Sequence, residues 1–487
     1  MNTLYYGDNL DILRRYIKDD SVDLVYLDPP FNSKQDYNVL FSEKNGSGAS
    51  AQIKAFEDTW HWDFNASKNF QEIVEAGGDI SLVMQAFRQF LGENDMMAYL
   101  AMMTPRLIEL QRVLKDTGSI FLHCDPTASH YLKILMDAIF KKYFRNEIIW
   151  HYKKWPAKQK QFSRNHDVIL FYSKSENPDR IFNKKYMERS ASTLKRFGNA
   201  QIISAHDEEG NRLPSQTSED ESLGVPLDDV WDIGRVPPVK QLFPTQKPDA
   251  LLERIIEVAT NEGDVVLDPF CGCGTTITNA QKLNRSWIGI DITHLAITLI
   301  KHRLKDGFGD NNKYNVIGEP ADLSGALELA QSDPYQFQWW ALGLVGARPV
   351  EQKKGADKGI DGRLFFHDDE SGKTKQMIFS VKAGQVHSSH IRDLNGVLER
   401  EKAVMGVLIS MEEPTRNMVK EANASDLYEA ESLGKKYPKI QIITVGELLE
   451  GKKIEMPYHA PKTFKKAEKF IKKDAEEISA FDNVKEE

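Results

Sequence analysis

The chain has 487 residues, of which 41% are apolar, so it can bury the cores of about three domains, and a wholly disordered or fibrous protein is excluded. Its three cysteines cannot form a disulfide framework, and it has neither a secretory leader nor an apolar run long enough to span a membrane, so we expect a cytoplasmic protein without a membrane segment. The net charge of −9 excludes a generic polycation.

The first 152 residues alternate between predicted strands and predicted helices. In chain order they are a strand from Leu4, a helix over 10–17, a strand over 22–27, a loop over 33–70, a helical stretch over 81–115, a strand over 119–124, a helix over 128–142 and a strand over 147–152. This alternation predicts an α/β fold with a mostly parallel sheet and helices on both faces.

Residues 153–240 break the alternation, and we expect them to form an inserted recognition region. The overlapping stretch 141–200 carries 15 Lys or Arg against 5 Asp or Glu, and aromatic residues are interleaved among them, including Trp150, Tyr152, Trp155, Phe162 and Phe197. Focused positive charge with interleaved aromatic rings is typical of a surface that binds nucleic acid and wedges bases apart. A solvated helix face with spare lysines is the alternative interpretation.

The strand–helix pattern returns at Val265 with a buried strand that runs into a glycine-rich turn, Asp268-Pro269-Phe270-Cys271-Gly272-Cys273-Gly274. Glycines at this place let the backbone approach a ligand, and the absence of a lysine after Gly274 excludes a Walker phosphate loop. Asp291 ends the next strand, 19 residues after Gly272, where a carboxylate can accept both hydroxyls of a ribose. The pattern favours an adenosine-type ligand over a purely structural turn or a zinc site at Cys271 and Cys273.

A second motif, Asp28-Pro29-Pro30-Phe31, follows the predicted strand over 22–27. Two prolines fix the backbone and remove N–H donors, so the Asp28 carboxylate and the Pro29 carbonyl are left as acceptors beside the Phe31 ring. This set suits a planar aromatic amine, although a proline-rich turn capped by aspartate is the structural alternative.

The two motifs, with Phe243-Pro244-Thr245-Gln246-Lys247-Pro248 between them, resemble the DNA amino-methyltransferases of the β class, which methylate adenine N6 or cytosine N4. The resemblance covers residues 1–305. It implies S-adenosylmethionine as cofactor and double-stranded DNA as partner. The cofactor residues that the resemblance implies are Asp8, Thr245, Lys247, Asp268, Phe270, Gly272, Gly274 and Asp291, and the implied catalytic residues are Asp28, Pro29, Pro30 and Phe31.

In such an enzyme the target base is extruded from the duplex, and here it would stack on Phe31 and Trp60. Aspartate at position 28 favours adenine N6 within the family. The alternatives are a cytosine-N4 enzyme, a catalytically silent DNA-binding specificity subunit and an RNA substrate. Family members are often dimers, so a homodimer stays open.

Beyond a linker-like stretch at 306–320, a second α/β domain is predicted, with Asp361 before a strand over 363–367 and Lys382 ending a strand over 377–382. This arrangement resembles the restriction-endonuclease fold, whose carboxylates hold Mg²⁺ while a lysine orients water. Ser380 stands where a second ligand is usual, and Glu351 or Asp357 would have to replace it. An active nuclease with Mg²⁺ at Asp361, an inactive DNA-binding relic and an unrelated module all remain alternatives.

These expectations divide the chain into six parts. They are the catalytic half of a Rossmann-like methyltransferase domain at 1–152, the target-recognition region at 153–240, the cofactor-binding half at 241–310, a linker at 311–330, the restriction-endonuclease-like domain at 331–458 and a charged tail at 459–487.

Overall fold

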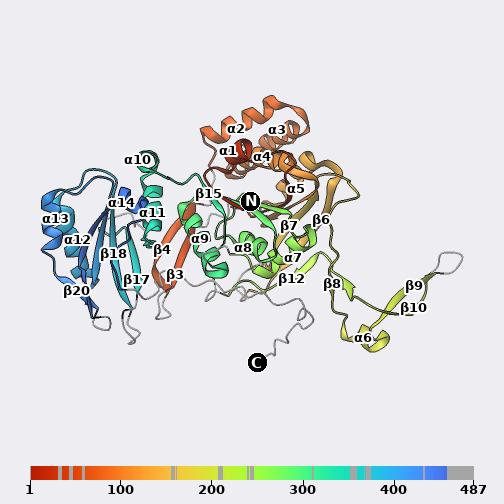
Figure 1. Ribbon diagram of the computed structural model, residues 1–487. Helices are drawn as coiled ribbons and strands as arrows, with labels where there is room; N and C mark the ends of the chain where they lie inside the picture. The colour runs from red at the N-terminus through yellow and green to blue at the C-terminus, as the bar shows by residue number, and fades with distance from the viewer. Residues whose placement is uncertain are drawn as a thin grey trace.

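The structure is a computed structural model, and Figure 1 gives its ribbon. It describes residues 2–30, 36–42, 48–57, 61–154, 160, 162–206, 212–237, 241, 246–309, 312–350, 359–366, 368, 374–430 and 434–457, with the backbone alone at 36–42, 48–57, 204–206, 212–216 and 218–220. The predicted tail at 459–487 lies outside the described residues.

A nine-stranded sheet forms the centre of the larger domain, in the order β12-β6-β7-β5-β2-β13-β14-β1-β15. Its strands are β1 (Thr3–Tyr6), β2 (Val22–Leu27), β5 (Leu114–Cys124), β6 (Phe144–His151), β7 (His166–Ser173), β12 (Val230–Asp232), β13 (Val265–Asp268), β14 (Ser286–Asp291) and β15 (Asn315–Ile317). Every neighbouring pair is parallel except the two that involve β7. The predicted mostly parallel α/β sheet is therefore confirmed.

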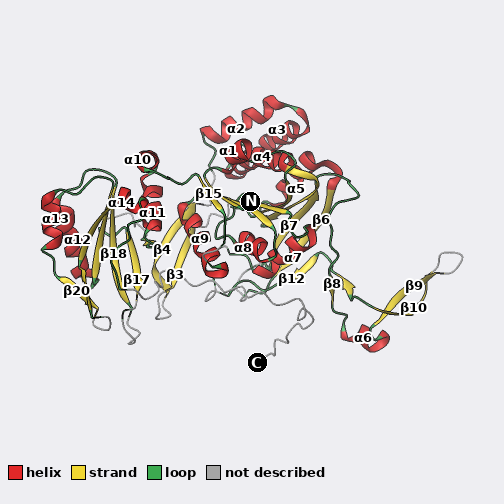
Figure 2. Ribbon diagram, in the orientation of Figure 1, coloured by secondary structure: helices red, strands yellow, loops and turns green. Residues whose placement is uncertain are grey.

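Helices cover both faces of this sheet, as Figure 2 shows. One face packs against α1 (Asn9–Tyr16), α2 (Phe64–Ala76), α3 (Gly78–Leu91), α4 (Asp95–Val113) and α5 (Ser129–Phe140). The short helix η1 (Lys141–Tyr143) directly follows α5. The other face packs against α7 (Asp249–Ala259), α8 (Thr275–Lys282) and α9 (His294–Phe308). Strands such as β2, whose residues are all buried, are mostly apolar because both of their faces are covered.

The loop expectation over 33–70 was wrong, and two other predicted parts of the chain contribute strands to the large sheet. The loop predicted over 33–70 contains the antiparallel strands β3 (Asp36–Ser42) and β4 (Gly48–Glu57) and the start of α2. The recognition region predicted at 153–240 supplies β7 and β12 to the large sheet. The predicted linker contains β15, which pairs with β1, and α10 (Leu323–Ser332). Each of these strands depends on a long-range or irregular pairing that local periodicity does not reveal.

The rest of the recognition region extends away from the domain body (Figure 1). This arm, residues 186–206 and 212–226, consists of β8 (Tyr186–Met187), α6 (Ala191–Phe197), β9 (Ala200–His206), β10 (Arg212–Glu221) and β11 (Val225–Pro226). Strand β8 pairs with β11, and β9 pairs with β10, both antiparallel.

The C-terminal domain has a five-stranded sheet in the order β16-β17-β18-β19-β22. Its elements are α11 (Pro334–Leu344), β16 (Arg348–Pro349), β17 (Gly362–Phe366), β18 (Lys375–Lys382), α12 (Ser388–Glu401), β19 (Met405–Ser410), α13 (Arg416–Asn423), β20 (Leu427–Ala430), β21 (Lys435–Pro438), β22 (Ile440–Thr444) and α14 (Val445–Leu449). The predicted strands around Asp361 and Lys382 are confirmed as β17 and β18.

Helix α11 fastens this domain to α9 of the larger domain. The backbone N–H of His294, in the first turn of α9, donates to the side-chain oxygen of Gln336 at 3.0 Å. Further along, a Cβ at Gly343 would lie 2.7 Å from the hydroxyl of Thr298, so only glycine lets the two helices approach this closely. Among the described residues, no helix has the length and apolarity needed to cross a membrane.

Candidate active site

Acidic side chains gather where the parallel strands of the large sheet end. Asp28 follows β2, Asp268 ends β13, and Asp291 ends β14 beside Tyr6 of β1. Parallel strands share one carboxyl edge, which is where ligands bind in open α/β sheets. The structure therefore brings both sequence motifs to the same edge.

The glycine turn after β13 is held by the strand next to it. The backbone N–H of Gly272 donates to Oδ2 of Asp291 at 2.9 Å, and Thr293 donates to Oδ1 through its backbone N–H and its hydroxyl, each at 2.9 Å. Gly272 and Gly274 have φ of +49° and +76°, in the left-handed region that favours glycine.

The two glycines face different surroundings. A Cβ at Gly274 would lie 2.6 Å from Cγ1 of Ile300, whereas the nearest atom to a Cβ at Gly272 is 4.0 Å away. Gly274 therefore permits close packing of the turn on α9, whereas a Cβ at Gly272 would have room.

Asp268 is a buried acid inside this turn, only 2% exposed. Burial raises its pKa to about 7, with nearby Asp28 and Asp291 adding to the effect, although hydrogen bonds from Thr276 and from the Phe270 backbone N–H oppose it. Because Asp268 binds Phe270 of its own turn, the structure gives it a part in shaping the loop.

Asp8 caps α1 at the start of the same edge. Its Oδ1 accepts the N–H of Leu10 at 2.9 Å, and its Oδ2 accepts from Arg106 at 2.6 Å. Arg106 also donates to the side-chain oxygen of Asn9 at 2.6 Å, and the Asn9 amide donates to the carbonyl of Pro269 at 2.8 Å. This chain of contacts ties the β1–α1 turn to the glycine turn, and sequence reasoning missed Asn9 and Arg106.

The proposed catalytic carboxylate has a cationic partner. The ammonium of Lys247 lies 2.5 Å from Oδ2 of Asp28, and both side chains are largely buried, with 12% and 17% of their surface exposed. Sequence reasoning assigned Lys247 to the cofactor's carboxylate and did not anticipate this contact. Phe31, Trp60 and Thr245 lie outside the described residues.

A buried polar network lies next to Asp28 and was also missed. Tyr26 and His123 are 3.1 Å apart, His123 and Asp167 are 3.3 Å apart, and the Tyr152 hydroxyl donates to Asp167 at 3.0 Å. Burial alone would raise the pKa of Asp167, but the hydrogen bond and charge of His123, with the charge of Lys247, lower it to about 2. The signal available in the sequence was a set of polar residues inside otherwise apolar strands.

The aromatic residues of the basic stretch 141–200 differ in how exposed their side chains are. Trp150 and Tyr152 were expected to serve as wedges, but they are 2% and 5% exposed and belong to the core. Phe162 is 97% exposed and remains available to a partner. The cations of Lys154 and Arg235 lie 4.9 and 5.5 Å from the centre of the Tyr152 ring, so positive charge does flank the active edge.

In the C-terminal domain, the described residues around Asp361 do not fit a Mg²⁺ site. Oδ2 of Asp361 accepts from the backbone N–H of Val381 at 2.6 Å and from the Ser380 hydroxyl at 3.3 Å, and the Lys382 ammonium is 3.5 Å away. Among the described residues, no group of three or more His, Cys, Asp or Glu is placed to hold a metal ion. The substitute ligands Glu351 and Asp357 lie outside the described residues. The expected Mg²⁺ site is therefore not supported.

Comparisons with known proteins agree with this two-part architecture. Residues 22–302 match the profile of the family described as DNA methylase, and residues 336–450 match that of NACHT-associated inactive restriction endonuclease 1. The fusion with a restriction-endonuclease-like domain is thus supported, and the nuclease activity considered for it is not.

Two curated relatives cover most of the larger domain. Type II methyltransferase M.HpaI of Haemophilus parainfluenzae is 27% identical over 345 residues, which are 68% of this chain and 84% of that protein. DNA adenine methyltransferase YhdJ of Escherichia coli is 26% identical over 306 residues, 62% of this chain and 82% of that protein.

Among solved structures, the PvuII DNA methyltransferase (cytosine-N4-specific) is 15% identical with a TM-score of 0.36, covering 64% of this chain and 88% of that chain. The match to M1.HpyAVI in complex with SAM has 18% identity and a TM-score of 0.33, and covers 62% of this chain and 100% of that chain. Because the family profile spans more than half of the sequence, and the motifs on which it rests meet at one sheet edge, this chain belongs to the DNA methylase family.

Proposed function

We propose that the protein transfers a methyl group from S-adenosylmethionine to N6 of an adenine that it extrudes from duplex DNA. The observation that carries the proposal is the meeting of Asp28 and the Asp268–Asp291 glycine turn at one edge of one sheet. The similarity to a DNA adenine methyltransferase supports adenine as the target. Cytosine N4 is the alternative, because its amino group offers the same donors.

The residues of the glycine turn fit the cofactor. The room beside the Gly272 backbone supports close approach of a ligand there, and the Asp291 carboxylate at the end of β14 is the kind of acceptor that a ribose requires. Phe270, Gly274, Asp268, Asp8, Thr245 and Lys247 complete the proposed cofactor-binding set. When bound, S-adenosylmethionine supplies an activated methyl group.

Asp28 and its neighbours act on the target amine. Lys247 engages Oδ2 of Asp28, which orients the carboxylate and leaves Oδ1 to accept an N–H of the base. The Pro29 carbonyl would accept the second N–H, and Phe31 would stack on the ring. Fixing both hydrogens directs the nitrogen lone pair toward the methyl donor, so positioning and electrostatics carry the rate. The nitrogen that gains the methyl group would release one of its two protons, through the Asp28 carboxylate to solvent.

The basic surface would hold the DNA. Lys154 and Arg235 beside Tyr152 bring positive charge to the active edge, where they can neutralise phosphates next to the extruded nucleotide. Unstacking a base costs a few kcal/mol, which stacking in the pocket and phosphate contacts would offset. A homodimer remains a prediction.

The proposal is tested by incubating the protein with duplex DNA and S-adenosylmethionine, digesting the DNA and identifying the methylated nucleoside by mass spectrometry. We expect N6-methyladenine from the parent and from Asp179→Ala, which removes an exposed acid, and none from Asp28→Ala with cofactor binding retained. N4-methylcytosine would change the target base alone. Near-normal turnover by Asp28→Ala, or methylation of RNA but not of DNA, would refute the proposal.

A further inference from the structure

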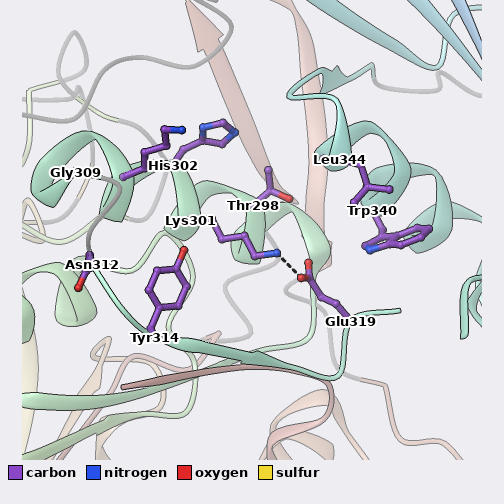
Figure 3. A pocket seen from close by; sticks show the side chains of 11 residues that line it. Thr298, Lys301, His302, Gly309, Asn312, Tyr314, Glu319, Trp340 and Leu344 are labelled. Carbon is purple, nitrogen blue, oxygen red and sulfur yellow. Dashed lines mark hydrogen bonds and ion pairs between the residues drawn. The ribbon is translucent and has the colours of Figure 1, made fainter. Parts of the chain in front are cut away.

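A cavity of about 310 Å³ lies where the two domains meet. Figure 3 shows its walls: α9 of the methylase domain contributes Lys301 and His302, the segment around β15 contributes Asn312 and Tyr314, and α11 of the C-terminal domain contributes Trp340. None of the residues assigned to methyl transfer lines this cavity, so it is a second site.

The walls are rich in hydrogen-bond donors. Two lysines, Lys301 and Lys305, line the cavity together with the hydroxyls of Thr298 and Tyr314. The Nδ2 of Asn312 is buried and has no hydrogen-bond partner among the described residues. A buried amide donor without an acceptor costs about 1–3 kcal/mol, so a ligand acceptor placed against it would be favoured.

The carboxylate in the cavity wall already has a cationic partner. Glu319 is the one carboxylate among the described lining residues. It pairs with Lys301, and it lies 3.6 Å from Nδ1 of His294. Two lysines against one carboxylate among the described lining residues, together with the unpartnered Nδ2 of Asn312, favour a ligand that accepts hydrogen bonds and carries negative charge.

We propose that this cavity binds a small phosphate-bearing anion of about mononucleotide size. Ligand cavities span about 300–1,000 Å³, and this one lies at the lower end, which suits a small molecule. The phosphate oxygens accept from Asn312 and from the lysines of α9, and the rest of the ligand lies against Tyr314 and α11.

Occupancy of the site would bear on both domains. A ligand here contacts α9 and α11 together, and binding to a junction stabilises the docked arrangement by mass action. Lys301 also connects the cavity through Glu319 to His294, whose ring stacks on Tyr6 at a centroid distance of 3.6 Å. Tyr6 ends β1 beside Asp291, so this series of contacts runs from the cavity to the sheet edge where the proposed cofactor site lies.

The test is calorimetric titration of the full chain with uridine monophosphate and, separately, with pyrophosphate. S-adenosylhomocysteine is present at saturation, so that the proposed cofactor site is filled, and DNA is absent. We expect saturable binding of one equivalent to the parent. Asn312→Leu and Lys305→Glu should each weaken it at least tenfold, whereas Lys420→Glu, the same charge change on exposed α13, should leave it unchanged.

Several outcomes would overturn the proposal. One is the absence of saturable binding of either probe. Another is equal weakening by Lys420→Glu, which would mean that the anion responds to overall charge. A third is a loss of duplex DNA binding in Asn312→Leu and Lys305→Glu without any effect on uridine monophosphate, because the cavity would then contact a polymer backbone. The test does not depend on methyl transfer, so its failure leaves the proposed function untouched.

Discussion

The two glycines of the turn after β13 should fail in different ways when each is replaced by alanine. Gly274→Ala meets two penalties: a left-handed φ of +76°, which costs about 1–2 kcal/mol, and a Cβ 2.6 Å from Ile300, which adds about 1–3 kcal/mol of overpacking. Gly272→Ala meets the backbone penalty of about 1–2 kcal/mol but has open space for its methyl group.

Urea unfolding and cofactor binding separate these effects. We expect Gly274→Ala to lose about 2–5 kcal/mol of stability without cofactor. Gly272→Ala should lose less than half of that, yet bind S-adenosylmethionine at least tenfold more weakly, since its methyl group enters the space assigned to the ligand. Normal cofactor affinity in Gly272→Ala would show that the open space is not the cofactor site and would refute the assignment.

Three further variants test single contacts. Lys247→Met should reduce methyl transfer at least tenfold in a steady-state assay, because Asp28 loses the cation that orients it. Between pH 5 and pH 8, the stability of Asp268→Asn relative to the parent should increase by about 2–3 kcal/mol in urea unfolding. The reason is that the folded-state pKa of Asp268 is raised to about 7. Ionisation of Asp268 therefore destabilises the folded parent progressively as the pH rises toward 7, and fully above it. A parent whose stability does not fall relative to the variant would contradict this. Asp361→Ala should lower the free energy of unfolding by about 1–3 kcal/mol, because the Val381 N–H loses its acceptor. Mg²⁺ should not raise the melting temperature of the parent. A clear rise would support a metal site at Asp361.

Much of the large sheet could be predicted because its strands carry local signals. β2, β13 and β14 are mostly apolar runs with an acid at or directly after their last residue, followed by a turn. Strand β7 lies between β5 and β6 in the sheet, although it follows both of them in the sequence. Sequence order therefore does not indicate its position. β12 and β15 have three residues each, too few for periodicity to identify. These segments are strands because each pairs with a neighbouring strand of the sheet, which their composition does not indicate.

The site residues likewise fall into those that the sequence indicates and those that it does not. Asp28 and the glycine turn are readable because each is a short motif with its own backbone requirement. The contact of Lys247 with Asp28 joins residues 219 positions apart, and that of Arg106 with Asp8 joins residues 98 positions apart. Contacts of this range depend on the order of strands in the sheet, which the sequence pattern left open.

The docking of α11 on α9 makes one backbone amide an indicator of domain separation. The His294 N–H lies in the first turn of its helix, where no carbonyl of the same helix can accept it, and its acceptor is Gln336 of the other domain. Its hydrogen-exchange rate therefore depends on how often α11 lifts away, while amides deeper in α9 follow the opening of the helix itself. Where exchange is limited by the opening equilibrium, the ratio of the intrinsic to the observed exchange rate of the His294 amide gives the free energy of domain separation, without cutting the chain.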